Sequence, residues 1–247
     1  RAHGDGLLGC VTYMIPELEA ALDTIFRTAI ENGFDLDFHV DESNDPAARS
    51  LEAIADAALR HRFTGKILAG HCCSLALQQP ADEARIIAKV AEAGIAVVSL
   101  PMCNMYLQDR QAGRTPRWRG VTALHELKAA SVPVMIASDN TRDPFYAYGD
   151  LDLVEVLREG TRILQLDHSG PDWADAVART PAEVMGVRAR VIAVGAPADL
   201  IMVDLDEPWI VSEAGIRSRS KNTCFEGARL QGKVLQTLVA GRTVFNA

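Results

Sequence analysis

Asp35-Leu-Asp-Phe-His-Val40 is a short run typical of a β-strand, and a segment with helical character follows it. That segment carries apolar residues at helical spacing, at Leu51, Ile54, Ala55, Ala58 and Leu59. Asp45 and Pro46 suit the N-cap and the first position of the helix. We therefore expect one strand followed by one helix, the unit on which the rest of the chain is built.

The same unit occurs along most of the chain. The expected strands are Gly6–Met14, Asp35–Val40, Lys66–His71, Ala96–Leu100 and Pro133–Ser138. A helix is expected behind each of them: from Pro16 to Asn32, from Asp45, over Pro80–Gly94, around Val121–Ala130 and over Asp150–Leu166. The strand ends recur at roughly thirty residues, the length that a right-handed βαβ crossover needs. Parallel strands at this period predict either a doubly wound sheet or a (β/α)8 barrel.

Polar residues at the strand ends favour the barrel. His39, Asp41, Glu42, His71, Asn104, Asp139 and Asn140 all fall at or just beyond the carboxyl end of an expected strand. In a closed barrel these ends converge on one site. A nucleotide-binding doubly wound sheet would need a glycine-rich turn after its first strand, and the sequence has no G-x-G-x-x-G or Walker motif. We expect a (β/α)8 TIM-barrel-like fold of which only five units are present, so that the N-terminal barrel strands are missing.

The end of the chain has a different pattern, which predicts a small β module. Val191–Val194 and Leu200–Val203 are expected to form a hairpin, and Lys233–Phe245 a second one around Ala240-Gly241. The expected division is a barrel segment over residues 1–188 and the C-terminal half of a β-sandwich over residues 189–247.

Composition and charge exclude several classes of protein. The chain has 247 residues, of which 48% are hydrophobic and 23% charged, as in a globular protein. The net charge of −8 gives no reason to expect a nucleic-acid partner, and no apolar run approaches the ~20 residues that span a membrane. Five cysteines, two of them adjacent and none in a Cys-x-x-Cys pair, suit a reduced, cytoplasmic protein.

Residues that suit metal chemistry lie at three of the strand ends. His39, His71 and Asp139 are ligand types for Zn²⁺ or Fe²⁺, and a nearby carboxylate such as Glu42 can move protons during hydrolysis. A single histidine at a strand end is more often a hydrogen-bonded structural residue, but the shared location favours a common site. Glu42 can join His39 only if the chain turns directly after the strand, and Asp41 either tunes Glu42 or binds a backbone amide.

Several stretches resemble the cytosine deaminase branch of the amidohydrolase superfamily. They are His39-Val-Asp-Glu42, Gly70-His71, Leu100-Pro-Met-Cys-Asn104-Met-Tyr-Leu-Gln108-Asp-Arg110, Arg119-Gly120-Val-Thr122 and Ser138-Asp-Asn-Thr-Arg-Asp-Pro-Phe-Tyr146. The resemblance runs from about Leu7 to Gly186. Behind it, Ile192–Leu200 resembles the superfamily's return to its β-sandwich, and Ser220–Gly227 with Gly232–Leu235 is similar to dihydroorotases and hydantoinases.

The resemblance implies a divalent metal ion, zinc or iron, and a role for each strand-end residue. His39 would be a metal ligand, Asp139 both a metal ligand and the general base, Glu42 the group that moves a proton to the ring nitrogen, and His71 the residue that orients the attacking water. Asn140 departs from the family pattern, in which a second carboxylate often follows the metal aspartate, and it could change which ring substituent is recognised. Trp118 could cover a substrate ring or lie in a solvated loop.

The function expected from this resemblance is the hydrolytic deamination of a small pyrimidine-like heterocycle. One alternative is hydrolysis of a cyclic amide, as in dihydroorotases and hydantoinases. The other is an inactive fragment, because the family carries a His-x-His ligand pair that is absent from this chain, and the chain resembles the C-terminal part of a longer enzyme. An exposed edge at Gly6–Met14 would favour a homo-oligomer.

Overall fold

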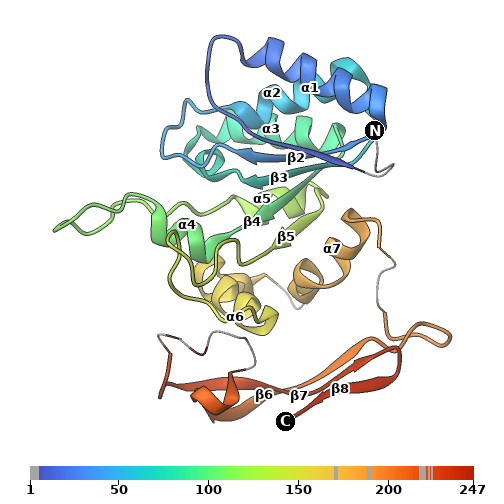
Figure 1. The fold of residues 1–247 in the computed structure, drawn as a ribbon. Coiled ribbons are helices and arrows are strands. Elements are labelled where there is room, and N and C mark those ends of the chain that lie inside the picture. The colour runs from blue at the N-terminus through green and yellow to red at the C-terminus, as the bar shows by residue number, and fades with distance from the viewer. Residues whose placement is uncertain (1–5, 170–171, 188–190, 217–220, 222, 224) are drawn as a thin grey trace.

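The computed structural model describes residues 6–169, 172–187, 191–216, 221, 223 and 225–247. Two sheets organise these residues (Figure 1). The larger has five parallel strands: β1 (Leu7–Val11), β2 (Asp35–Val40), β3 (Ile67–His71), β4 (Ile95–Ser99) and β5 (Val134–Ile136). Their spatial order β1-β2-β3-β4-β5 follows the order of the chain, as it does around a barrel. The predicted succession of five parallel strands is confirmed.

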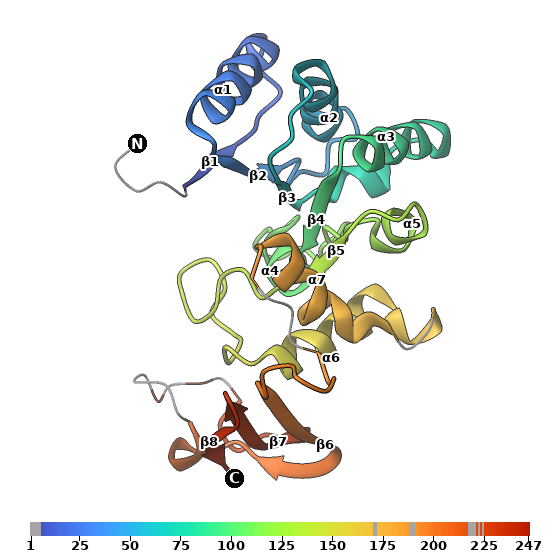
Figure 2. The ribbon, with the colours of Figure 1, turned by 90° about the vertical axis from the view of Figure 1, so that its right-hand side faces the viewer.

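Helices cover the convex face of this sheet. Figure 2 shows α1 (Leu18–Asn32), α2 (Ser50–His61) and α3 (Pro80–Glu92) side by side against it. The remaining helices are α4 (Pro101–Leu107), α5 (Leu124–Ala129), α6 (Leu153–Leu164) and α7 (Arg179–Val184). Short 3₁₀ turns cover Cys73–Leu77, Leu166–His168, Asp172–Val177 and Glu213–Gly215. Among the described helices, none has the combination of length and apolar character that a membrane crossing requires.

Side chains of β2 alternate between the helices and the open face of the sheet. Leu36, Phe38 and Val40 are buried beneath the helices, where the Phe38 ring lies 6.3 Å from the ring of Phe26 on α1. His39 points to the other face and is exposed. Because side chains alternate along a strand, the packing of Phe38 and Val40 fixes the face on which His39 lies.

The beginning of α2 differs from the prediction. Asp45 was expected as the N-cap, but the helix begins at Ser50, and the Asp45 carboxylate instead accepts the Ala47 N–H at 2.8 Å within a turn. The capping function falls to Asp41, whose two carboxylate oxygens accept the N–H groups of Ser50 and Leu51, each at 2.9 Å. Burial raises the pKa of Asp41, while these two N–H donors act to lower it.

A second difference lies behind β4, where the sequence pattern predicts no helix before the one around Val121–Ala130. The chain forms α4 there, with Pro101 in its first turn, a position at which proline costs no helical hydrogen bond. The segment is short and its pattern is weak, so its helical character was missed.

The C-terminal sheet has the antiparallel order β6-β7-β8, with β6 at Leu200–Ile210, β7 at Arg229–Val239 and β8 at Arg242–Asn246. The hairpin around Ala240-Gly241 is confirmed, but the one pairing Val191–Val194 with Leu200–Val203 is wrong. Residues 191–194 form bends and turns, and β6 pairs with β7 instead. Arg158 on α6 donates to the Gln231 carbonyl at 3.2 Å, joining this sheet to the helical layer.

Two predictions in this region fall wholly or partly outside the described residues. The domain boundary expected between residues 188 and 189 lies outside the described residues, so the division into two domains stays a prediction. Part of the Ser220–Gly227 stretch is likewise not described.

The capping role of Asp41 is tested by stability. Asp41→Ala removes two hydrogen bonds at the start of α2 and is expected to lower the free energy of unfolding by about 1–3 kcal/mol. Asp45→Ala, the control, removes one exposed turn contact and is expected to cost less than about 1 kcal/mol. Urea unfolding followed by circular dichroism measures both. Equal losses, or a larger loss at Asp45, would contradict the assignment.

Candidate active site

The carboxyl ends of β2 and β3 bring two histidines into contact. His39 Nδ1 and His71 Nε2 lie 2.9 Å apart, so one proton is shared between these two nitrogens. His71 is buried, with 2% of its surface exposed, and its carbonyl accepts the Thr122 hydroxyl at 2.7 Å. The register pairs Val40 with His71 and His39 with Gly70. The parallel alignment of the two strands therefore places the two histidines next to each other.

Glu42 joins this pair because the chain turns immediately after β2. Asp41 has a positive φ of 47°, a left-handed conformation that reverses the direction of the strand. The Glu42 carboxylate then lies 3.8 Å from His71 Nδ1. It accepts the Asn104 amide at 2.9 Å and the Gln108 amide at 3.3 Å. The sequence pattern allows Glu42 to reach His39 only if the chain turns directly after the strand, and this turn is present at Asp41.

Asp139 stands at the end of β5, exposed and with a positive φ of 60°. The Cys103 thiol on α4 is buried beside it and approaches Asn140 Oδ1 at 3.5 Å. Burial, together with the negative charge of Asp139, raises the pKa of Cys103 to about 12. The thiol is therefore a neutral hydrogen-bond donor. Sequence reasoning missed Cys103, although it lies in the same motif as Asn104.

The side-chain amide of Asn140 forms a hydrogen bond within the loop that follows β5. Its side-chain amide donates to Asp143 at 2.6 Å, and Asp143 also accepts the N–H groups of Phe145 and Tyr146, each at 2.9 Å. These donors, Tyr146 first, hold the pKa of Asp143 below its ordinary value. Asn140 thus shapes the loop after β5, and its predicted contact with substrate stays a prediction.

A cleft of about 750 Å³ opens at this edge of the sheet. Its lining includes His39 and Glu42 from the end of β2, Tyr13 from the end of β1 and Phe145 from the loop after β5. Phe145 is 61% exposed. The volume falls within the range of small-molecule sites, about 300–1,000 Å³.

Trp118 is not among the described residues that line this cleft. It lies in the loop before Gly120, where the Arg117 N–H, the Arg114 guanidinium and, least, the Trp118 N–H hold the pKa of Asp109 below its ordinary value. Its predicted role over a substrate ring stays a prediction.

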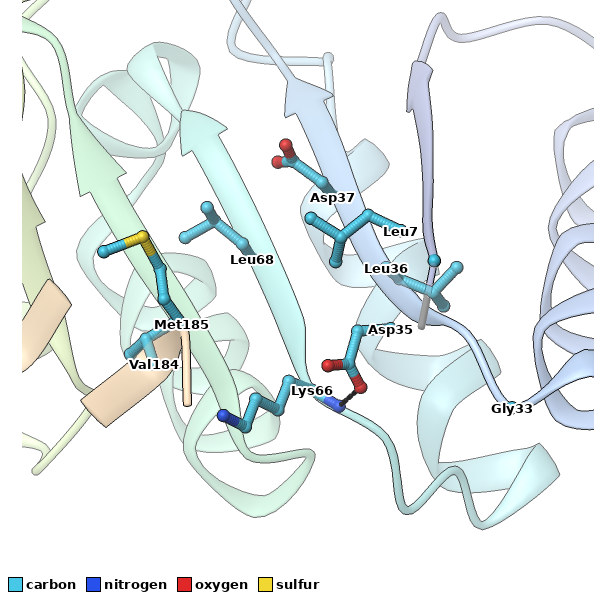
Figure 3. Close-up of a pocket in the computed structure, with 10 residues that line it drawn as sticks. Leu7, Gly33, Asp35, Leu36, Asp37, Lys66, Leu68, Val184 and Met185 are labelled. Carbon is cyan, nitrogen blue, oxygen red and sulfur yellow. Dashed lines mark hydrogen bonds between the residues drawn. The ribbon is translucent and has the colours of Figure 1, made fainter. Parts of the chain in front are cut away.

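A second cavity, of about 400 Å³, lies on the same open face but at the amino ends of the strands (Figure 3). Asp35 and Asp37 of β2 project into it, together with Lys66 and with Met185 from behind α7. The Lys66 backbone N–H donates to Asp35 at 2.7 Å. Residues of the His39 cluster do not line it, so it is separate from the chemistry of the strand ends.

His39 and Asp139 suit a divalent metal ion. The contact with His71 uses Nδ1 of His39 and leaves Nε2 as the nitrogen for a metal, and the exposed Asp139 carboxylate supplies oxygen donors. Within the described part of the chain, no three His, Cys, Asp or Glu side chains are grouped as a metal site. His39 and Asp139 therefore suit a metal ion as two members of a ligand set, and the described residues do not supply a complete one.

Comparison with known proteins gives concordant results. The model of the amidohydrolase family matches residues 8–245. A pterin deaminase from Rhizobium rhizogenes is 60% identical over 199 residues, which cover 80% of this chain and 45% of that protein. A dihydroorotase from Anaplasma phagocytophilum is 43% identical over 67 residues, covering 27% of this chain and 15% of that protein. The chain thus spans about half the length of the pterin deaminase. It matches a smaller share, 15%, of the dihydroorotase.

Solved structures agree on the fold. A 5-methylcytosine deaminase from Klebsiella pneumoniae superposes with a TM-score of 0.76 at 23% identity, covering 98% of this chain and 56% of that one. An N-isopropylammelide isopropylaminohydrolase from Burkholderia multivorans gives a TM-score of 0.69 at 22% identity, with coverages of 99% and 56%. The five strands and their helices are therefore a partial TIM-barrel-like fold of the amidohydrolase type.

The burial and the raised pKa of the Cys103 thiol give a prediction for this site. Because its thiol is buried and has a pKa of about 12, we expect iodoacetamide at neutral pH to leave Cys103 unmodified in the folded protein and to modify it after denaturation. Peptide mass spectrometry measures the fraction modified at each cysteine. Rapid modification of Cys103 in the folded protein would show that the thiol is exposed or ionised.

Proposed function

This chain belongs to the amidohydrolase family, and on that basis we propose that it takes part in the metal-dependent hydrolytic deamination of an aromatic nitrogen heterocycle. The single observation that carries the proposal is the cluster at the ends of β2 and β3. A carboxylate, Glu42, is held by two amide donors beside the paired His39 and His71, at the wall of a cleft large enough for such a ring.

In this proposal, His39 and Asp139 hold zinc or iron. When bound, the ion would lower the pKa of water and stabilise the negative charge that develops on the oxygen added to the amino-bearing carbon. His39 and Asp139 are a nitrogen and a carboxylate donor, which suit either metal. The choice between zinc and iron, and the number of ions, do not follow from these two residues.

The chain's own residues would carry the protons. Asp139 accepts a proton from the attacking water and later passes it to the departing amine, so that ammonia leaves as a neutral molecule. Glu42 accepts the other proton of the attacking water and passes it to the ring nitrogen next to the amino-bearing carbon, so Glu42 begins and ends the reaction as a carboxylate. His71, buried and fixed through Thr122, orients the groups around it. Water and the amino heterocycle are thereby converted to an oxo heterocycle and ammonia.

A pterin-like bicyclic ring is the substrate class we favour over a single pyrimidine. The support is the 60% identity to a pterin deaminase across 80% of this chain, a stronger similarity than that to the 5-methylcytosine deaminase or to the dihydroorotase from Anaplasma phagocytophilum. A cleft of about 750 Å³ has room for two fused rings. The exposed ring of Phe145 in its lining offers a face against which such a ring can stack.

Hydrolysis of a cyclic amide is the second candidate. Several dihydroorotases match parts of this chain, among them one from Ehrlichia chaffeensis that is 32% identical over 129 residues. The two reactions use similar residues but have different products, because cyclic amide hydrolysis opens a ring and releases no ammonia.

The test is ammonia release by the intact protein, supplied with zinc or iron and offered pterin, cytosine and dihydroorotate. We expect ammonia from pterin, loss of activity on chelation and recovery when the metal is restored. Asp139→Asn removes the proposed base and is expected to lower kcat by at least about 100-fold. Asp37→Asn is the matched control, because it removes a carboxylate from the same sheet face at the separate cavity, and it should retain activity.

Two outcomes would overturn the proposal. Full turnover by Asp139→Asn would exclude Asp139 as base and ligand. Opening of dihydroorotate without ammonia release from pterin or cytosine would favour cyclic amide hydrolysis instead.

A further inference from the structure

Asn104 is a buried side chain that touches both proton-handling groups of the cluster. It is fully buried, with 0% of its surface exposed, and it lies on α4, far from Glu42 and His71 in sequence. Its Nδ2 is 2.9 Å from Glu42 Oε1 and 3.0 Å from His71 Nδ1. A buried polar group with two such contacts is strongly constrained, because moving it away from both would leave it without a partner in the interior.

The orientation of the amide follows from its partner. An ionised carboxylate can only accept hydrogen bonds, so the atom facing Glu42 must be the amide nitrogen. In the opposite orientation, the amide oxygen would face the carboxylate oxygen and the two would repel. The same amide lies within hydrogen-bond distance of His71 Nδ1 through both of its atoms, Nδ2 at 3.0 Å and Oδ1 at 3.4 Å, so it donates to that nitrogen or accepts from it according to the tautomer of His71.

The backbone around Asn104 is built to hold the amide in this place. Its N–H donates to the Leu100 carbonyl at 3.0 Å, which ties it to the first turn of α4 at the end of β4. Gly120 packs against the same turn with a positive φ of 66°, and a Cβ at that position would lie 2.4 Å from Gln108 Cγ and 3.4 Å from Asn104 Cβ. A side chain at position 120 would therefore displace the Gln108 side chain and come into van der Waals contact with Asn104.

Glu42 itself has little else to fix it. It follows the left-handed turn at Asp41, and its side chain is 35% exposed at the edge of the cleft. Gln108 supplies a second bond, but this bond is longer, at 3.3 Å, and exposed. The buried amide of Asn104 is thus the firmest contact that the described residues give to the Glu42 carboxylate.

We propose that Asn104 is a positioning residue that fixes the Glu42 carboxylate beside His71, so that Glu42 meets the substrate nitrogen in one orientation. The inference rests on the proposed function for the role of Glu42, but the contact itself does not. A general acid that is displaced by about 1 Å loses up to about 100-fold in rate, because proton transfer depends on the alignment of donor and acceptor. Removing Asn104 should therefore slow the reaction without weakening substrate binding.

The first experiment separates binding from catalysis in the intact, metal-loaded protein. Asn104→Ala and Asn104→Asp are expected to lower kcat for ammonia release by about 100-fold and to leave KM within about three-fold. Gln108→Ala removes only the exposed bond and should lower kcat by less than about ten-fold. Asn246→Asp, at an exposed position on β8, is the control for the amide-to-acid change and should match the wild type.

The second experiment needs no turnover and is made on the metal-free protein. Asn104→Asp places two carboxylates against each other and should lower the melting temperature. Adding Glu42→Gln restores a donor facing an acceptor and should recover most of that loss. The double variant should remain inactive, because a glutamine cannot supply the proton. This double-mutant cycle tests the Asn104–Glu42 contact even if the wild type releases no ammonia.

Three results would overturn the proposal. The first is an increase in KM with unchanged kcat for the Asn104 variants, which would place Asn104 in substrate binding. The second is a loss of kcat no larger than that of Gln108→Ala. The third is additivity of the two substitutions in the melting temperature, which would show that the side chains do not interact. Absence of activity in the wild type, with strong coupling in the cycle, would count against the proposed function and for the contact.

Discussion

The parallel pairing of β2 with β3 is the constraint on which the rest of the site depends. It places His39 beside Gly70 and Val40 beside His71, and it directs the carboxyl ends of both strands to the same edge. Phe38 and Val40, buried under the helices, prevent a shift by one residue, since such a shift would move His39 into the core. The hydrophobic packing of the convex face therefore fixes the chemistry of the concave one.

Left-handed backbone at the strand ends completes this arrangement. Asp41, His71 and Asp139 all have positive φ, and each stands where the chain must leave its strand abruptly. Aspartate and histidine tolerate this conformation better than β-branched residues do, but it still costs free energy. The cost is offset by specific contacts: the Asp41 carboxylate caps α2, and the His71 carbonyl accepts the Thr122 hydroxyl. Strain and its compensation thus lie at the same places as the candidate chemistry.

The sequence was sufficient to predict the local units of the fold and the residues at their ends. Strand and helix periodicity depend on neighbouring residues, and so does the end of α1 at the left-handed Gly33, so β2 and α1 lie close to their expected places. Apart from the short helix α4, the failures involve distant partners. Asp41 replaced Asp45 as the cap of α2 through contacts nine and ten residues along the chain, and β6 paired with β7 instead of Val191–Val194. The Asn104–Glu42 bond spans 62 residues, which no local pattern reveals.

The open face of the sheet bears on assembly and on the metal. Leu7 and Val11 of β1 are 72% and 54% exposed, and exposed apolar side chains at a sheet edge favour association, so a homo-oligomer stays a prediction. The central claim is that the ends of β2, β3 and β5 form one metal-dependent site. Anomalous diffraction from crystals of the intact protein grown with zinc or iron tests it most directly. The account predicts a peak within about 2.0–2.2 Å of both His39 and Asp139, with Glu42 held by Asn104 beside it. Metal bound elsewhere, with His39 and Asp139 both free of it, would contradict the account.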